Sequence, residues 1–142
     1  MNTALRWTSI ILFTLLSAFL IWFGWLYASV EHPLWFHDAA VPEHAKEAVR
    51  PLYFALMNLI GGSSAALGLL GLFVTLTALR QGAKAAGSVL AIAFVIPVVM
   101  AAITAEELAA ATGSPTSWHI MGALLFITLI AYLAHLGAKR AN

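Results

Sequence analysis

The sequence predicts an all-α integral membrane protein: a four-helix antiparallel bundle with a structured outer loop between the first and second helices. Hydrophobic residues make up 62% of the 142 residues and charged residues only 9%, against about 25% charged in an average soluble domain. Four runs carry no charged residue, at about 8–30, 52–79, 86–105 and 117–137. Each meets the roughly 20 residues that a helix needs to cross a bilayer. A chain this short is expected to form a single transmembrane domain, residues 1–142.

The first run, 8–30, has one feature of a secretion signal, because Arg6 precedes its apolar stretch. A cleaved signal, however, has a short apolar core that ends in small residues. This run is longer and ends in the bulky sequence WFGWLY. We therefore expect the first helix to be retained as an anchor.

The outer loop, 31–51, is the longest connection in the chain. Pro33 and Pro42 prevent one continuous helix across it, because proline lacks an amide donor and clashes with the preceding turn. After Pro42, the sequence PEHAKEAV has the first-position proline and early acid that are typical of a short surface helix. Arg50 followed by Pro51 then predicts a break before the second helix.

The other two connections are short. Only RQGAKAAG separates the second run from the third, and EELAAATGSPTS separates the third from the fourth. These helices should therefore form antiparallel hairpins packed as neighbours. Ser114 and Pro115 provide a cap and a first-turn residue that predict the start of the fourth helix. Pro97 predicts a kink in the third helix.

Small residues recur along the second helix at steps of three and four, which places them on one face. They are Gly61, Ser64, Gly68, Gly71 and Thr75, and Asn58 lies one turn before them. In lipid, helices associate through close backbone approach at such stripes and through buried polar side chains. The stripe predicts helix packing within the bundle, and the alternative is a face for self-association.

The distribution of lysine and arginine predicts the orientation in the membrane. One side of the predicted topology carries Arg6, Arg80, Lys84, Lys139 and Arg140, and the other carries only Lys46 and Arg50. Both termini should therefore be cytoplasmic, and we expect the membrane to be a bacterial inner membrane. All six acids and four of the five histidines then lie on the outer face, which is the face expected to carry the chemistry.

The sequence VEHPLWFHDAAVPEH, residues 30–44, holds His32, His37 and His44 beside the aromatic residue Trp35. A folded loop could bring these histidines together with Asp38 or Glu43 to hold zinc or copper. Their spacing differs from that of a helical HxxxH pair, and histidines beside membrane aromatics also serve as interfacial polar groups. Both interpretations, a metal site and an interfacial loop, remain open from the sequence.

Glu106, Glu107 and His119 border the predicted last loop and should meet at the outer ends of the third and fourth helices. Carboxylate and imidazole together are capable of acid–base chemistry. Adjacent glutamates are also common where a helix enters water, and no catalytic motif accompanies them. The sequence therefore favours a binding role for these residues over an enzyme.

Several classes of function have little support in the sequence. Bis-histidine haem is disfavoured because His119 and His135 share one helix, about 24 Å apart at 1.5 Å per residue. Haem would need His119 and a loop histidine. No charged residue lies in the middle of a predicted helix, which argues against ion-coupled transport, voltage sensing and proton relays. The chain has no cysteine for disulfides or thiolate sites, and no basic patch that would bind nucleic acid.

The sequence ALMNLIGGSSAALGLLGLFVTLTALRQ, followed by a basic turn and two more helices, resembles the small four-helix DoxX-like membrane proteins over residues 51–137. The shared features are an asparagine followed by small residues and a terminal arginine. The histidine-bearing first loop has no counterpart in that pattern. The resemblance implies an accessory role beside quinone-linked redox enzymes and transfers no catalytic residue to this chain.

These observations predict a small membrane accessory subunit or ligand-binding module, in contact with membrane lipid and without a required cofactor. Its outer face would bind a protein partner, a second copy of the chain or an amphipathic small molecule. The candidate binding residues are His32, Trp35, His37, His44, Glu106, Glu107 and His119. The alternative is a membrane redox or metal-dependent enzyme component whose loop histidines coordinate an ion.

Overall fold

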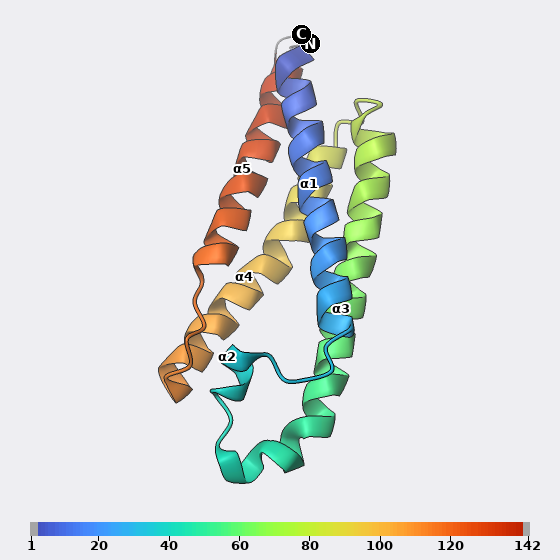
Figure 1. Ribbon diagram of the computed structural model, residues 1–142. Helices are drawn as coiled ribbons and strands as arrows, with labels where there is room; N and C mark the ends of the chain where they lie inside the picture. Colours follow the sequence, from blue (N-terminus) through green and yellow to red (C-terminus); the bar gives the residue numbers. More distant parts are fainter. Residues whose placement is uncertain (1–2, 141–142) are drawn as a thin grey trace.

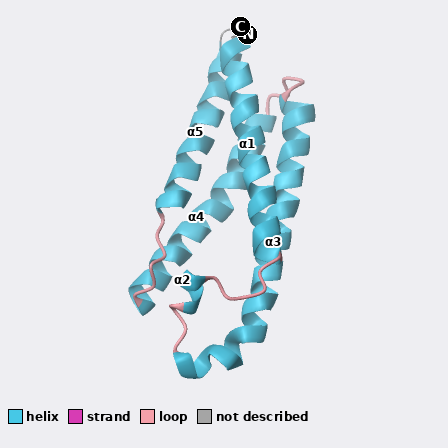
Figure 2. Ribbon diagram, viewed as in Figure 1, coloured by secondary structure: helices cyan, strands magenta, loops and turns pink. Residues whose placement is uncertain are grey.

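Four long helices form a bundle (Figures 1 and 2) in the computed structural model, which describes residues 3–140. The elements are α1 (Thr3–Ala28), α2 (Trp35–Asp38), the 3-10 turn η1 (Glu43–Ala45), α3 (Lys46–Val74), the π-helical turn η2 (Thr75–Leu79), α4 (Ala86–Thr112) and α5 (His119–Arg140). Four segments are long and apolar enough to cross a membrane: Thr3–Ala28, Glu43–Leu79, Ala86–Thr112 and His119–Lys139. The predicted fold class is confirmed.

The bundle has two different ends. At one end, which we call the terminal end, α1 begins, α5 finishes and the turn 80–85 joins η2 to α4 (Figure 1). At the opposite end, the loop end, residues 29–45 connect α1 to α3. Helix α1 packs along α3 and α5, and α4 packs along α5. Contact between α3 and α4 is slight, and Figure 1 shows the two helices diverging from their shared turn.

Close backbone contact joins α1 to α3. A Cβ added to Gly61 would lie 2.5 Å from the amide nitrogen of Ala28, and one added to Gly24 would lie 2.5 Å from that of Ala65. Gly68 meets the backbone of Ser17 in the same way, at 2.7 Å from its carbonyl oxygen. Only a residue without a side chain fits at these positions, so the small-residue stripe is buried inside the monomer.

The other members of the stripe differ in their surroundings. Gly71 lies against the ring of Phe94, and Thr75 is buried with its hydroxyl donating to the Gly71 carbonyl at 2.7 Å. Ser64 is half-buried. Asn58 does not belong to the contact with α1, because its side chain is exposed and lies beyond the level at which α1 ends.

The hydrophobic core lies toward the terminal end, where the four helices converge. Its centre is the pair Phe13 and Phe94, whose ring centroids are 6.1 Å apart. The buried cluster consists of Ile10, Phe13, Leu16, Leu79, Ala86, Leu90, Phe94 and Ala131. Every long helical segment contributes to it, so this end of the bundle is fixed by side-chain packing.

The predicted break at Arg50 and Pro51 is wrong. Helix α3 already begins at Lys46 and continues through Pro51 to Val74. Proline near the start of a helix removes only one hydrogen bond, the one to the carbonyl four residues earlier. That carbonyl belongs to Glu47, which is exposed and can be hydrated. The expected short surface helix after Pro42 is instead the turn η1, which leads directly into α3.

The predicted boundary between the third and fourth helices is also wrong. Helix α4 passes the expected end at 105 and finishes at Thr112, followed by Gly113 with φ of 68°. Alanine and glutamate favour helix, so the sequence AEELAAAT extends α4 and carries Glu106 and Glu107 with it. Ser114 and Pro115 do not start α5, which begins at His119. Pro97 lies inside α4, which continues on both sides of it.

Candidate functional site

The connection at the loop end is folded against α3 by one tyrosine. The Tyr53 hydroxyl, on α3, accepts a hydrogen bond from the backbone amide of Leu34 at 3.0 Å. The same hydroxyl lies 3.1 Å from Nδ1 of His37 on α2. Tyr53 therefore holds both the entry to α2 and its histidine.

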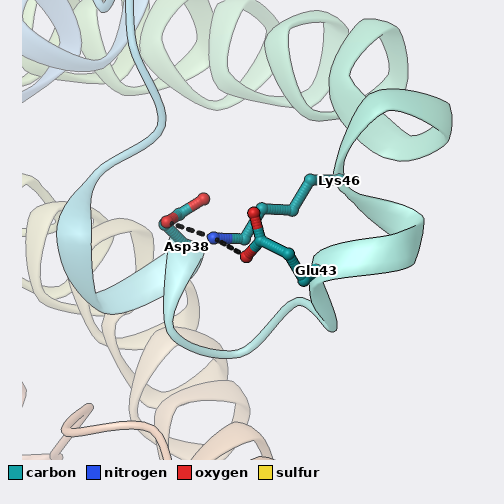
Figure 3. A network of polar contacts seen from close by, with 3 residues as sticks. All are labelled: Asp38, Glu43 and Lys46. Atoms are coloured by element: carbon teal, nitrogen blue, oxygen red, sulfur yellow. Dashed lines mark hydrogen bonds and ion pairs between the residues drawn. The ribbon is translucent and has the colours of Figure 1, made fainter.

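An ion-pair network closes the second half of the loop (Figure 3). Lys46 Nζ lies 2.8 Å from Asp38 Oδ2 and 2.9 Å from Glu43 Oε2. The Asp38 carboxylate is partly shielded from solvent, whereas that of Glu43 is almost fully exposed. Because exposed ion pairs are screened by water, we assign the bridge from Asp38 to Lys46 the larger part in holding the loop.

A third tie fastens the loop to the other side of the bundle. The Ser114 hydroxyl donates to the Phe36 carbonyl oxygen, and Ser114 is buried in the connection between α4 and α5. In the same connection, the Thr116 hydroxyl donates to the Ala105 carbonyl at 2.8 Å. The loop thus bridges α3 and the α4–α5 connection at the end where α3 and α4 are apart.

These ties leave a cavity of about 200 Å³ between the loop and the first turns of α3. Its lining contains both signs of charge together with an imidazole and a phenol. The lining residues are His32, Pro33, His37, Asp38, Val41, Lys46, Glu47, Val49, Arg50 and Tyr53. A cavity of this composition can hold a polar group through hydrogen bonds and through attraction to either charge.

Aromatic rings surround the histidine of the cavity. The His37 ring centroid lies 4.5 Å from that of Phe36, 5.6 Å from that of Tyr53 and 6.4 Å from that of Tyr27. Burial in this setting disfavours the charged imidazolium and lowers the pKa of His37 below its ordinary value of 6.5. At neutral pH the ring is uncharged, with one nitrogen able to donate and the other able to accept.

The predicted loop residues are divided by the structure. His32 and His37 line the cavity, whereas His44 and Trp35 are exposed and do not. Within residues 3–140, no group of three or more histidine, aspartate and glutamate side chains is placed to hold a metal ion. The hypothesis of zinc or copper on His32, His37 and His44 therefore has no site in the described part of the chain.

The predicted second cluster does not form a common site. Glu106 Oε1 accepts a hydrogen bond from the Trp118 amide at 3.4 Å, at the start of α5. His119 stacks on the Trp118 ring at 4.9 Å and contacts the Ser117 hydroxyl at 2.9 Å. Among the ion pairs of residues 3–140, none joins His119 to either glutamate. Glu106, Glu107 and His119 are exposed and lie outside the cavity lining.

The sequence analysis missed the α3 side of the cavity. Lys46, Val49, Arg50 and Tyr53 are spaced by three, one and three residues, so they share one face of a helix. This signal was present in the sequence. It was lost because the expected break at Pro51 assigned the first three residues to the loop and Tyr53 to a separate helix.

No protein-family model, curated protein or solved structure matches the chain. The structure defines its class as a helical bundle with four candidate membrane spans. The resemblance to DoxX-like proteins rests on the quoted sequence features alone and stays a prediction.

Proposed function

We propose that the chain is a small membrane module that binds the polar head group of an amphipathic molecule in the loop-end cavity. The observation that carries the proposal is this cavity of about 200 Å³ with its mixed lining. Sites for whole small molecules measure roughly 300–1,000 Å³. The volume therefore suits a head group better than a complete ligand.

The apolar part of such a ligand would lie along α3. Leu56 and Ile60, three and seven residues after Tyr53, share its helix face. Both are exposed, at 45% and 39%. A chain that leaves the cavity beside Tyr53 would therefore meet apolar side chains along the span.

The lining favours a head group that carries both charges. Asp38 and Lys46 are already paired with each other, whereas Glu47 and Arg50 have exposed side chains at the same cavity. A cationic group near Glu47 and an anionic group near Arg50 would complement these charges. Neutral His37 and the Tyr53 hydroxyl add hydrogen bonds without adding charge.

A phosphate-free zwitterion tests this proposal: N-dodecyl-N,N-dimethylglycine, titrated into the protein in dodecyl maltoside. We expect saturable binding, followed by the ring signal of His37 in NMR spectra of histidine-labelled protein. Tyr53→Phe should weaken binding about tenfold, since a lost hydrogen bond of about 1.4 kcal/mol corresponds to that factor. Tyr132→Phe, on α5, is the matched control and should bind normally. Equal affinities for the wild type and Tyr53→Phe would overturn the proposal.

The proposed setting is a bacterial inner membrane with the cavity on the outer side and both termini in the cytoplasm. It is supported by the excess of lysine and arginine at the terminal end. We predict that a reporter fused to the C-terminus is active only in the cytoplasm and that one inserted at Ala40 is active only outside. The opposite pattern would move the cavity to the cytoplasmic face.

The exposed Trp35 and His44 side chains support a protein partner as a second occupant of this face. Capture of such a partner should then depend on Trp35 and not on Tyr53. The redox or metal-dependent alternative has no supporting observation in the structure. We therefore base the proposal on the cavity.

A further inference from the structure

A second, smaller cavity lies at the terminal end, between α1, α5 and the turn after η2. Its volume is about 30 Å³, and its lining includes Arg6, Ser9, His135 and Lys139. It lies at the opposite end of the bundle from the loop-end cavity, and the two linings share no residue.

Two polar atoms of this lining are buried without a partner. The Ser9 hydroxyl and Nε2 of His135 make no hydrogen bond, although the two residues are only 1% and 7% exposed. Buried polar atoms without partners are rare in folded proteins, and each one calls for a bound group that the protein chain does not supply. Both atoms belong to residues that line the same cavity, so a single bound group can reach both.

The His135 ring is held in place. A Cβ on Gly87 of α4 would clash with the imidazole, so the ring packs directly on the α4 backbone. The Lys84 carbonyl and the Lys139 ammonium also act on the imidazole. The ring has therefore little freedom to turn Nε2 toward solvent.

Two cations flank the cavity and are themselves positioned by backbone carbonyls. Arg6 donates one N–H to the Arg80 carbonyl, and Lys139 donates to the Lys84 carbonyl. Arginine has five N–H donors and lysine three. Each side chain therefore keeps donors for a further partner at the cavity.

The charge at this end is not compensated. Arg6, Arg80, Lys84 and Lys139 gather here, whereas all six acids of the sequence lie within 31–47 and 106–107, toward the other end. Water in the cavity would satisfy Ser9 and His135 but would leave the positive charge unbalanced. An anion with several acceptor oxygens satisfies both requirements.

We propose that this cavity is the binding site of a phosphate group. A volume of about 30 Å³ holds one or two water-sized atoms, so one phosphate oxygen enters and meets Ser9 and His135. The rest of the group stays at the mouth, where Arg6 and Lys139 neutralise it. The phosphate can belong to an anionic lipid head group at the membrane surface or to a free phosphate in solution.

The test uses the full chain in dodecyl maltoside with two probes, dioleoyl phosphatidylglycerol and inorganic phosphate. Native mass spectrometry counts retained lipid, and NMR of histidine-labelled protein follows the His135 ring. The His135 signal is the one that survives when the other four histidines are changed to Gln. The variants are Arg6→Gln with Lys139→Gln, and the matched control is Arg80→Gln with Lys84→Gln. Both pairs remove two charges from the same end, but only the first pair lines the cavity.

We expect the His135 signal to move with one or both probes. The cavity pair should bind at least tenfold more weakly than the wild type, and the control pair should stay within twofold. A response to the lipid alone identifies a head group as the ligand, and a response to inorganic phosphate identifies a soluble anion. Equal weakening in both pairs would show that only general surface charge matters, and the proposal would fail. It would also fail if the wild-type His135 signal moved with neither probe, a result that does not depend on how the variants fold.

Discussion

The two ends of the bundle are held together in different ways. At the terminal end, aromatic and aliphatic side chains from every long segment form one core around Phe13 and Phe94. At the loop end, hydrogen bonds and an ion-pair network fasten residues 29–45 across the separated helices. Packing between long helices thus defines the first end, and specific polar contacts define the second.

Helix lengths explain the difference. Helix α1 ends at Ala28, which is level with Gly61 of α3. The earlier part of α3 therefore continues past the end of α1 and has no helix beside it there. The loop occupies this position, and both its backbone and its charged side chains need partners. The cavity of about 200 Å³ forms where the loop meets this extension of α3.

Removing a core ring should have the largest effect on stability. Phe94 is 1% exposed, whereas Phe126 of α5 is 63% exposed. Phe94→Ala should lower the free energy of unfolding by about 3–5 kcal/mol, because it deletes buried contacts and leaves a void. Phe126→Ala, facing lipid or detergent, should have little effect. Thermal unfolding in dodecyl maltoside measures both, and equal losses would mean that the terminal end is not the packed one.

A side chain added between α1 and α3 should have the next largest effect. Gly61→Leu forces a side chain against the Ala28 backbone and should cost about 1–3 kcal/mol of unfolding free energy. Gly62→Leu is the control, since nothing lies within 4 Å of a Cβ at that neighbouring position. A change in oligomer size with unchanged stability for Gly61→Leu would instead place this face between two copies of the chain.

The bundle itself was predictable from sequence because four uncharged runs of sufficient length determine four spans, whatever their boundaries. Boundaries were less predictable. The prediction stopped the third helix at its last uncharged residue, although the glutamates and alanines that follow continue α4 to Thr112. Pro51 likewise permits helix where the carbonyl it leaves free is hydrated.

The loop-end cavity was predictable only in part. His32 and His37 were identified because histidines stand out in an apolar chain, but their convergence depends on Tyr53, a partner 16 residues after His37. His44 and Asn58 looked equally informative in the sequence and are exposed. Exposure depends on where α1 ends and on how the loop folds, and neither can be read from spacing alone.

The tie between the loop and the α4–α5 connection should make a moderate contribution. Ser114→Ala removes the donor to the buried Phe36 carbonyl and should lower the free energy of unfolding by about 1 kcal/mol. It should also increase cleavage of residues 29–45 by added protease. Ser63→Ala is the control, because its exposed hydroxyl bonds only within its own helix. Unchanged cleavage in Ser114→Ala would show that Tyr53 and Lys46 alone hold the loop.

The smallest expected effect is a pH dependence confined to the loop end. Burial lowers the pKa of His37, so the unfolded chain takes up a proton at higher pH than the folded chain does. Stability from this residue is therefore complete above its unfolded value of 6.5 and declines as the pH falls through that value toward the lowered pKa of the folded state. His37→Gln should flatten this decline in thermal unfolding measured between pH 7.5 and pH 5, written here as approximate limits around the ordinary histidine range. The cavity also contains His32, Asp38, Glu47 and Tyr53, so His32→Gln is the necessary control and should leave the slope unchanged. If the slope disappears in His32→Gln and persists in His37→Gln, the exposed histidine rather than the aromatic-enclosed one controls the loop.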